Sequence, residues 1–93
     1  MIIAAATVKL YAPWVHSLKD KRMVVQSILS RTRNKFNISM IETGEQDTHQ
    51  TIVLGIACAA GTVAQADSIL DHVIDFIEKN TEAEITAIKR EIR

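Results

Sequence analysis

The chain has 93 residues, 47% of them hydrophobic, and its 11 basic residues balance its 11 acidic ones, which gives a pI near 6.8. This length suits a single domain, residues 1–93, and leaves little room for an enclosed active-site cavity. The balanced charge excludes a protein coated with positive charge for non-specific nucleic-acid binding, but it is compatible with a local basic patch.

The sequence carries no sign of a membrane segment or of an oxidised cysteine framework. No apolar run approaches the ~20 residues that cross a bilayer, and the N-terminus lacks a basic segment followed by a cleavage site. We therefore expect a cytoplasmic protein. The single cysteine, Cys58, excludes an intrachain disulfide and a zinc site built from several cysteines. It lies inside an apolar run, as is typical of a buried packing residue.

The first part of the chain predicts a strand followed by a helix. Residues 1–11 are nearly all apolar and end before Pro13, as expected of a strand that is covered on at least one face. In residues 17–36 the apolar positions recur every three or four residues, which indicates a helix. Ser17 and Asp20 form a capping pair at its start.

The middle of the chain predicts a hairpin followed by a second helix. Residues 37–43 alternate as a short strand, and the polar residues 44–49 are typical of a hairpin loop. Residues 50–60 form a second buried strand, but their alternation leaves open which side faces the core. A helix with another capping pair at its start follows over residues 62–80.

Residues 81–93 fit two interpretations. Ile85, Ile88 and Ile92 follow helical spacing, whereas the β-branched residues suit a strand that carries a bulge. We predict a strand, because a sheet of three strands would leave the edge of the first strand open. The resulting order, βαββαβ, gives an α+β ferredoxin-like sandwich with an antiparallel four-stranded sheet and two helices on one face.

This topology leaves the second face of the sheet uncovered. The first strand presents five residues on that face: Ile3, Ala5, Thr7, Lys9 and Tyr11. They are too apolar for an ordinary solvated surface, so we expect a homodimer that associates through this face and that Ile3→Lys weakens. RNA lying across the sheet is the alternative, and it needs aromatic residues on both central strands, where only Tyr11 is present.

The first helix is strongly basic. Six cations and one anion lie in residues 17–37, and several of the cations crowd the helix start. Free N–H groups at a helix start bind anions, and cations beside them strengthen the binding. The predicted anion- or RNA-binding residues are Ser17, Lys19, Lys21, Arg22 and Arg33. The competing interpretation is a capped helix whose basic side chains are simply solvated.

Other polar residues give weaker signals. Asp67, Asp71 and Asp75 recur every four residues, which suits metal binding, pairing with a basic helix, or solvation. The three histidines lie in separate elements and match no metal-ligand motif. Trp14, in the loop before the first helix, either covers the end of the core or stacks on a base. We expect no metal, no cofactor and no catalytic residue.

Two segments, HSLKDKR at residues 16–22 and RNKFN at residues 33–37, resemble the YlxP-like family of small bacterial proteins, catalogued as a domain of unknown function. The resemblance continues to residues 90–92 and so covers essentially the whole chain. It implies a ferredoxin-like fold and no known activity or cofactor. Genes of this family often lie near those for translation initiation factors and ribosome-binding factor A, which favours a role with RNA or the ribosome.

These observations predict a non-enzymatic accessory protein, a homodimer, that binds structured RNA or a ribosomal partner through its basic helix. A protein-interaction or structural module is one alternative, and a binder of a small anionic ligand is another. Neither DNA nor a membrane is expected as a partner. Salt-dependent RNA binding would separate the first hypothesis from the other two.

Overall fold

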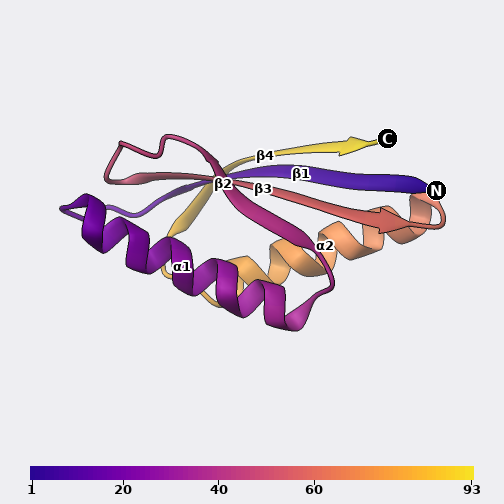
Figure 1. Cartoon of the computed structure of the whole chain (residues 1–93), viewed down its shortest axis with the longest axis horizontal. Helices are drawn as coiled ribbons and strands as arrows, with labels where there is room; N and C mark the ends of the chain where they lie inside the picture. The colour runs from indigo at the N-terminus through magenta and orange to yellow at the C-terminus, as the bar shows by residue number, and fades with distance from the viewer.

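Both helices lie on the same face of a four-stranded antiparallel sheet (Figure 1). The computed structural model describes residues 1–93, with elements in this order: β1 (Ile2–Tyr11), α1 (Leu18–Lys35), β2 (Ser39–Gly44), β3 (Thr51–Ala60), α2 (Val63–Lys79) and β4 (Glu84–Ile92). The strand order in the sheet is β2-β3-β1-β4, so the two most apolar strands are central. The predicted ferredoxin-like topology is confirmed.

Each helix begins after the capping residue that the sequence predicts. Ser17 Oγ accepts a hydrogen bond from the Asp20 N–H at 3.1 Å, and Thr62 Oγ1 accepts one from the Gln65 N–H at 3.1 Å. Gln65 Oε1 in turn accepts from the Gly61 N–H at 2.6 Å. These bonds satisfy donors that the first turn of a helix leaves free, so they fix where α1 and α2 begin.

The core lies between the sheet and the helices. Alternate residues of the central strands point toward the helices and are buried: Ala4, Ala6, Val8, Leu10, Ile52, Leu54 and Ile56. The alternate residues of β3 from Thr51 to Ala59 therefore lie on the uncovered face. This settles which side of β3 faces the core, a question that the alternation in the sequence left open. Neither helix has a stretch long and apolar enough to cross a membrane.

The last segment is a strand with a bulge, as predicted. The pairing of β4 with β1 shifts between Lys9 and Leu10, which leaves Thr86 as an extra residue. The Thr86 hydroxyl donates a hydrogen bond to the Lys9 carbonyl at 3.2 Å. An extra residue reverses the alternation of a strand, so Ile85 and Ile88 both point to the helix side.

β2 is an edge strand, and Arg33 of α1 covers part of its free edge. Arg33 Nε donates a hydrogen bond to the Met40 carbonyl at 3.1 Å, and Nη2 of the same guanidinium donates to the same oxygen. A charged side chain on an edge carbonyl discourages pairing with another chain. Arg33 therefore contributes to the fold itself, besides its predicted role in binding.

Arg33→Ala is expected to lower the free energy of unfolding by about 1–2 kcal/mol, because the Met40 carbonyl loses a charge-assisted partner at a partly solvated site. Arg33→Lys keeps the charge but not the forked guanidinium, so it should recover only part of this loss. Urea unfolding of both variants beside the parent measures the effect. An alanine variant as stable as the parent would show that the contact is not stabilising.

Candidate anion-binding surface of helix α1

Lys21 is a cation of α1 that solvent does not reach, since only 1% of the residue is exposed. Its Nζ lies 3.1 Å from Glu42 Oε2 and donates a hydrogen bond to the Glu45 carbonyl. The sequence spacing explains this burial, because Leu18, Lys21 and Val25 are three and four residues apart and share the sheet-facing side of the helix. Lys21 must therefore be removed from the predicted anion-binding set, because its ammonium already faces a carboxylate.

β2 brings Glu42 to the helix side of the sheet. Glu42 is opposite Leu54 in the β2–β3 register, so both side chains point to the same face. Glu42 Oε2 is buried and accepts no aligned hydrogen bond, which makes its contact with Lys21 an ion pair held by charge alone. The Glu42 side chain keeps 19% of its surface exposed, so water reaches the outer side of the pair.

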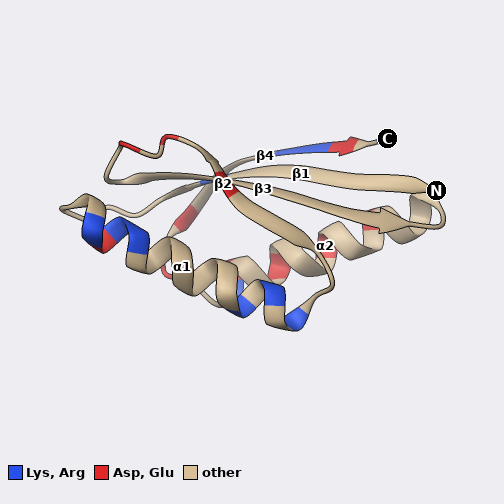
Figure 2. Ribbon diagram, in the orientation of Figure 1, with Lys and Arg blue, Asp and Glu red and all other residues tan.

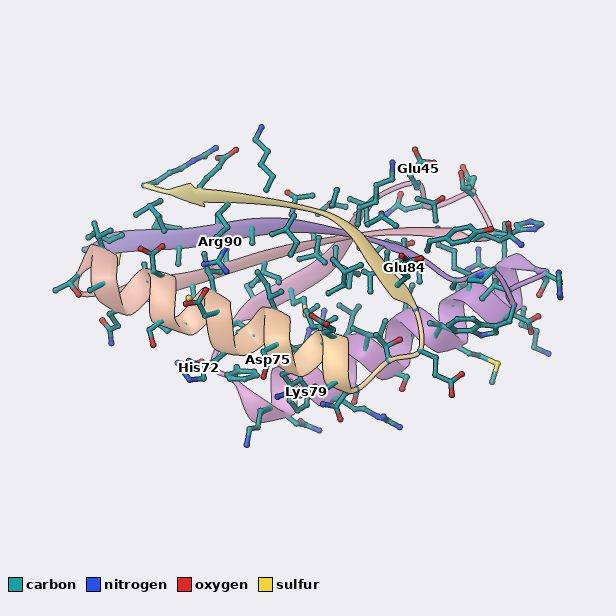
Figure 3. The ribbon with its side chains drawn as sticks, turned by 180° about the vertical axis from the view of Figure 1, so that it is seen from behind. Glu45, His72, Asp75, Lys79, Glu84 and Arg90 are labelled. Carbon is teal, nitrogen blue, oxygen red and sulfur yellow. The ribbon has the colours of Figure 1, made fainter.

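Glu45 closes the β2–β3 hairpin in a left-handed backbone conformation, with φ at 54°. Non-glycine residues adopt this conformation uncommonly, so neighbouring contacts must hold it. The Glu45 carbonyl accepts hydrogen bonds from Lys21 Nζ and, at 3.0 Å, from the Thr48 N–H, while Thr48 Oγ1 donates to Glu45 Oε2 at 2.7 Å. Lys21 thus ties the start of α1 to the hairpin, where Glu45 is labelled in Figure 3.

The other cations of α1 are exposed, and none of them forms an ion pair: Lys19, Arg22, Arg31, Arg33 and Lys35. Every cation of α2 and β4, by contrast, lies against a carboxylate, as does Arg93. Figure 2 shows basic residues at both ends of α1 and acidic residues along α2. A chain that is neutral overall therefore has one basic and one acidic helix, side by side.

The predicted binding residues do not form one compact site. Ser17, Lys19 and Arg22 lie together at the start of α1, where the Ser17 hydroxyl is already used by the helix cap. Arg33 follows 14 positions after Lys19, roughly 21 Å along the helix axis at 1.5 Å per residue. The surface is thus an elongated basic side of α1, with Lys21 withdrawn from it.

Two of the three predicted aspartates of α2 pair with nearby cations. Asp71 Oδ1 lies 2.6 Å from Arg90 Nη2, and Asp75 Oδ2 lies 3.0 Å from Lys79 Nζ (Figure 3). Asp67 is exposed and forms no ion pair. No group of three or more metal-ligating side chains occurs in the structure. Asp71 attaches α2 to β4, so two of the three aspartates serve local pairing, and neither pairs with α1.

The fold brings together two histidines that sequence spacing did not connect. His16 and His49 line a hollow of about 430 Å³ with Tyr11 at the end of β1.

Trp14 is 42% exposed and lines a separate hollow beside α1, so it covers the core only in part. Burial raises the pKa of the Cys58 thiol, which keeps it protonated and a poor nucleophile at neutral pH.

Known proteins resemble this chain in sequence and in fold. A family model described as Protein of unknown function (DUF503) matches residues 3–90. The Uncharacterized protein YlxP of Bacillus subtilis (strain 168) is 43% identical over 75 residues, which cover 81% of this chain and 82% of that protein. A de novo designed protein with a ferredoxin fold, solved by solution NMR, matches 100% of this chain and 86% of its own at a TM-score of 0.60. Its sequence identity is 22%, so this likeness concerns the fold alone.

Proposed function

Since the chain belongs to the DUF503 family of proteins of unknown function, we propose its role from its own surface: a non-enzymatic accessory protein that binds the phosphate backbone of structured RNA through α1. The observation that carries the proposal is the absence of an acidic partner for the five exposed cations of this helix. An unpaired surface cation can neutralise a phosphate without first releasing a carboxylate, and the release of counterions from the nucleic acid then favours binding.

Along the helix axis the five cations form two clusters. Lys19 and Arg22 lie near the start of α1, while Arg31, Arg33 and Lys35 lie in its last two turns. Around the axis, Arg33 shares a flank with Lys19 and Arg22, whereas Arg31 and Lys35 lie on the other flank. The eight uncharged residues 23–30 separate the clusters, so the two nearest members, Arg22 and Arg31, are nine positions apart, or roughly 13.5 Å along the axis at 1.5 Å per residue. Two separated clusters suit phosphates on two backbone segments, which a folded RNA presents side by side. The proposal therefore names structured RNA rather than a short single strand.

The rest of the surface supports contact with the backbone rather than with the bases. α1 contains no aromatic residue on which a base could stack, and α2 beside it carries an excess of carboxylates that repel phosphate. An RNA backbone would therefore be confined to the α1 side of the protein. Binding of this kind reads the shape and charge of the RNA and is largely independent of its sequence.

The double variant Lys19→Ala/Arg22→Ala should weaken RNA binding and flatten its salt dependence, because each lost phosphate contact removes roughly one unit from the slope of log K against log salt. Fluorescence anisotropy with a labelled RNA hairpin, measured over a series of salt concentrations, gives both quantities. The matched control is Lys79→Ala/Lys89→Ala, which removes two exposed cations that already face carboxylates. The control should bind RNA as the parent does, and equal losses in the two doubles would contradict a site on α1.

A binder of a small anion at the start of α1 is the competing function. In that case inorganic phosphate would shift the amide resonances of residues 17–20, and RNA would bind no more tightly than phosphate itself. Arg33 offers a further distinction, because it lies far from the helix start and would not affect phosphate binding there. Loss of RNA affinity in Arg33→Gln, in protein that remains folded, therefore favours RNA over the small anion.

A further inference from the structure

We infer that the sheet face opposite the helices is an interface with a second copy of this chain, packed sheet against sheet. Figures 1 and 3 show that no element of the chain covers this face. The two central strands contribute small, uncharged residues to its centre: Ala5, Thr7, Gly55 and Ala57. Glu91 and Arg93, at the β4 side, line the same hollow. The solvent-exposed face of an antiparallel sheet normally carries polar side chains. Small, largely apolar residues at the centre of this face therefore indicate contact with another surface.

The face has both a shallow hollow and a protruding side chain, so its shape can be complementary to that of a second copy. A shallow hollow of about 390 Å³ lies over its centre. Gly55 and Thr43 both line it, and the Thr43 side chain packs over Gly55, since a Cβ there would come within 2.5 Å of Thr43 Cγ2. Ile41 rises at the side of the hollow with 56% of its surface exposed. A large exposed side chain next to a floor of small ones is self-complementary, because the isoleucine of one copy can enter the hollow of the other.

The face is large enough for a stable dimer. The strands have six, ten, ten and nine residues in sheet order, so at about 4.8 Å between strands and 3.4 Å per residue the footprint is roughly 570 Å² before surface relief is counted. This lies near the lower end of the range of ~600–1,000 Å² per partner of a standard protein interface. The proposed dimer therefore uses nearly the whole face, and Ile3 at its end, 40% exposed, would be covered as well.

Most charges of the face lie on the edge strand β4, where two cations share one carboxylate. On β4, Lys89 Nζ lies 3.7 Å from Glu91 Oε1, and Arg93 pairs with the other oxygen of the same carboxylate. Lys9 is the charge on the central strands, and its long apolar stem lets the ammonium reach solvent. The face has no cluster of unpaired cations and only Tyr11 as an aromatic, so it suits a second copy better than it suits RNA.

Packing through this face has a consequence for α1. Both helices of each copy lie on the far side of the sheet, so the two α1 helices would lie on opposite outer surfaces of the dimer. Each copy would then present its basic side independently, and dimer formation would not compete with an RNA bound to α1.

Sedimentation equilibrium of the full chain tests the interface. The parent is expected to dimerise in the micromolar range, and Ile41→Lys should raise the dissociation constant by roughly tenfold or more, because an apolar contact is replaced by a charge that must be desolvated. Met23→Lys is the matched control: Met23 is 65% exposed on α1, and its replacement should leave the constant unchanged. Thr7→Lys, in the middle of the sheet, provides a second test that does not depend on the edge strand.

Three outcomes would overturn the inference. One is a parent that stays monomeric up to about 1 mM, a concentration at which even a very weak dimer would be half formed. Another is a dimer that both Ile41→Lys and Thr7→Lys leave intact, which would indicate pairing through a strand edge. The third is a face whose amides become protected only when RNA is added. Because Lys19→Ala/Arg22→Ala should leave the dimer unchanged, failure of this inference is distinguishable from failure of the proposed function.

Discussion

Lys21→Ala is expected to lower the free energy of unfolding by about 2–4 kcal/mol, because it leaves the Glu42 carboxylate without a counterion on the helix side of the sheet. The change also opens a cavity and removes a donor from the Glu45 carbonyl, whose backbone is held in a left-handed conformation. For a domain of this size the melting temperature should fall by about 8 °C or more. Thermal and urea unfolding measure the change.

Two variants separate the loss of the ion pair from the loss of volume. Lys21→Met combined with Glu42→Leu replaces the pair by apolar groups of similar size and should recover most of the stability. Lys19→Ala removes an exposed cation two residues away and should change the free energy of unfolding by no more than about 0.5 kcal/mol. If Lys21→Ala were as mild as Lys19→Ala, the pair would not hold the hairpin to α1.

The burial of Lys21 shows where sequence reasoning failed at the site. A lysine is almost never fully buried unless it is paired with an anion. For that reason the residue type predicted that Lys21 is one of the solvated cations. Its position did carry a signal, because it falls between Leu18 and Val25 on the apolar side of α1. The partner Glu42 lies on another element, and only the register of β2 with β3 brings it to the helix side. One sequence shows the unusual position but not the partner.

The ambiguity of the last segment has a single physical cause. Ile85, Ile88 and Ile92 are spaced by three and four residues, as on a helix. In a regular strand, residues on one face are separated by an even number of positions. The bulge at Thr86 adds one residue, so Ile85 before the bulge and Ile88 and Ile92 after it all lie on the helix side of β4. Periodicity alone favoured neither a helix nor a strand. The strand was predicted because a three-stranded sheet would leave the edge of the first strand unpaired. The same local information predicted both helix starts, because a cap is a contact between residues three apart.

The features that sequence reasoning missed are contacts between distant elements. His16 and His49 belong to different loops, and they line one hollow because the first loop and the hairpin meet at the same end of the sheet. The contact of Arg33 with Met40 likewise follows from the position of α1 beside the edge strand. The apolar character of the uncovered face was predictable from alternation, because the face of a strand is a local property.

Leu54→Ala is expected to lower the free energy of unfolding by about 2–5 kcal/mol, whereas Val53→Ala should cost about 1 kcal/mol or less. Leu54 is fully buried between the sheet and the helices, so its loss leaves a cavity that rigid neighbours cannot fill. Val53, the adjacent residue, points to the uncovered face and is only half-buried in a single chain.

Unfolding of both variants at low protein concentration, where a dimer has dissociated, measures this difference between the two faces. In the proposed dimer the second copy covers that face and binding contributes to the stability of the folded chain, so Val53→Ala should become more costly at high concentration. The cost of Leu54→Ala should not depend on concentration in this way, since its site is already buried in one chain. Equal costs for the two variants at low concentration would contradict a core confined to the helix side of the sheet.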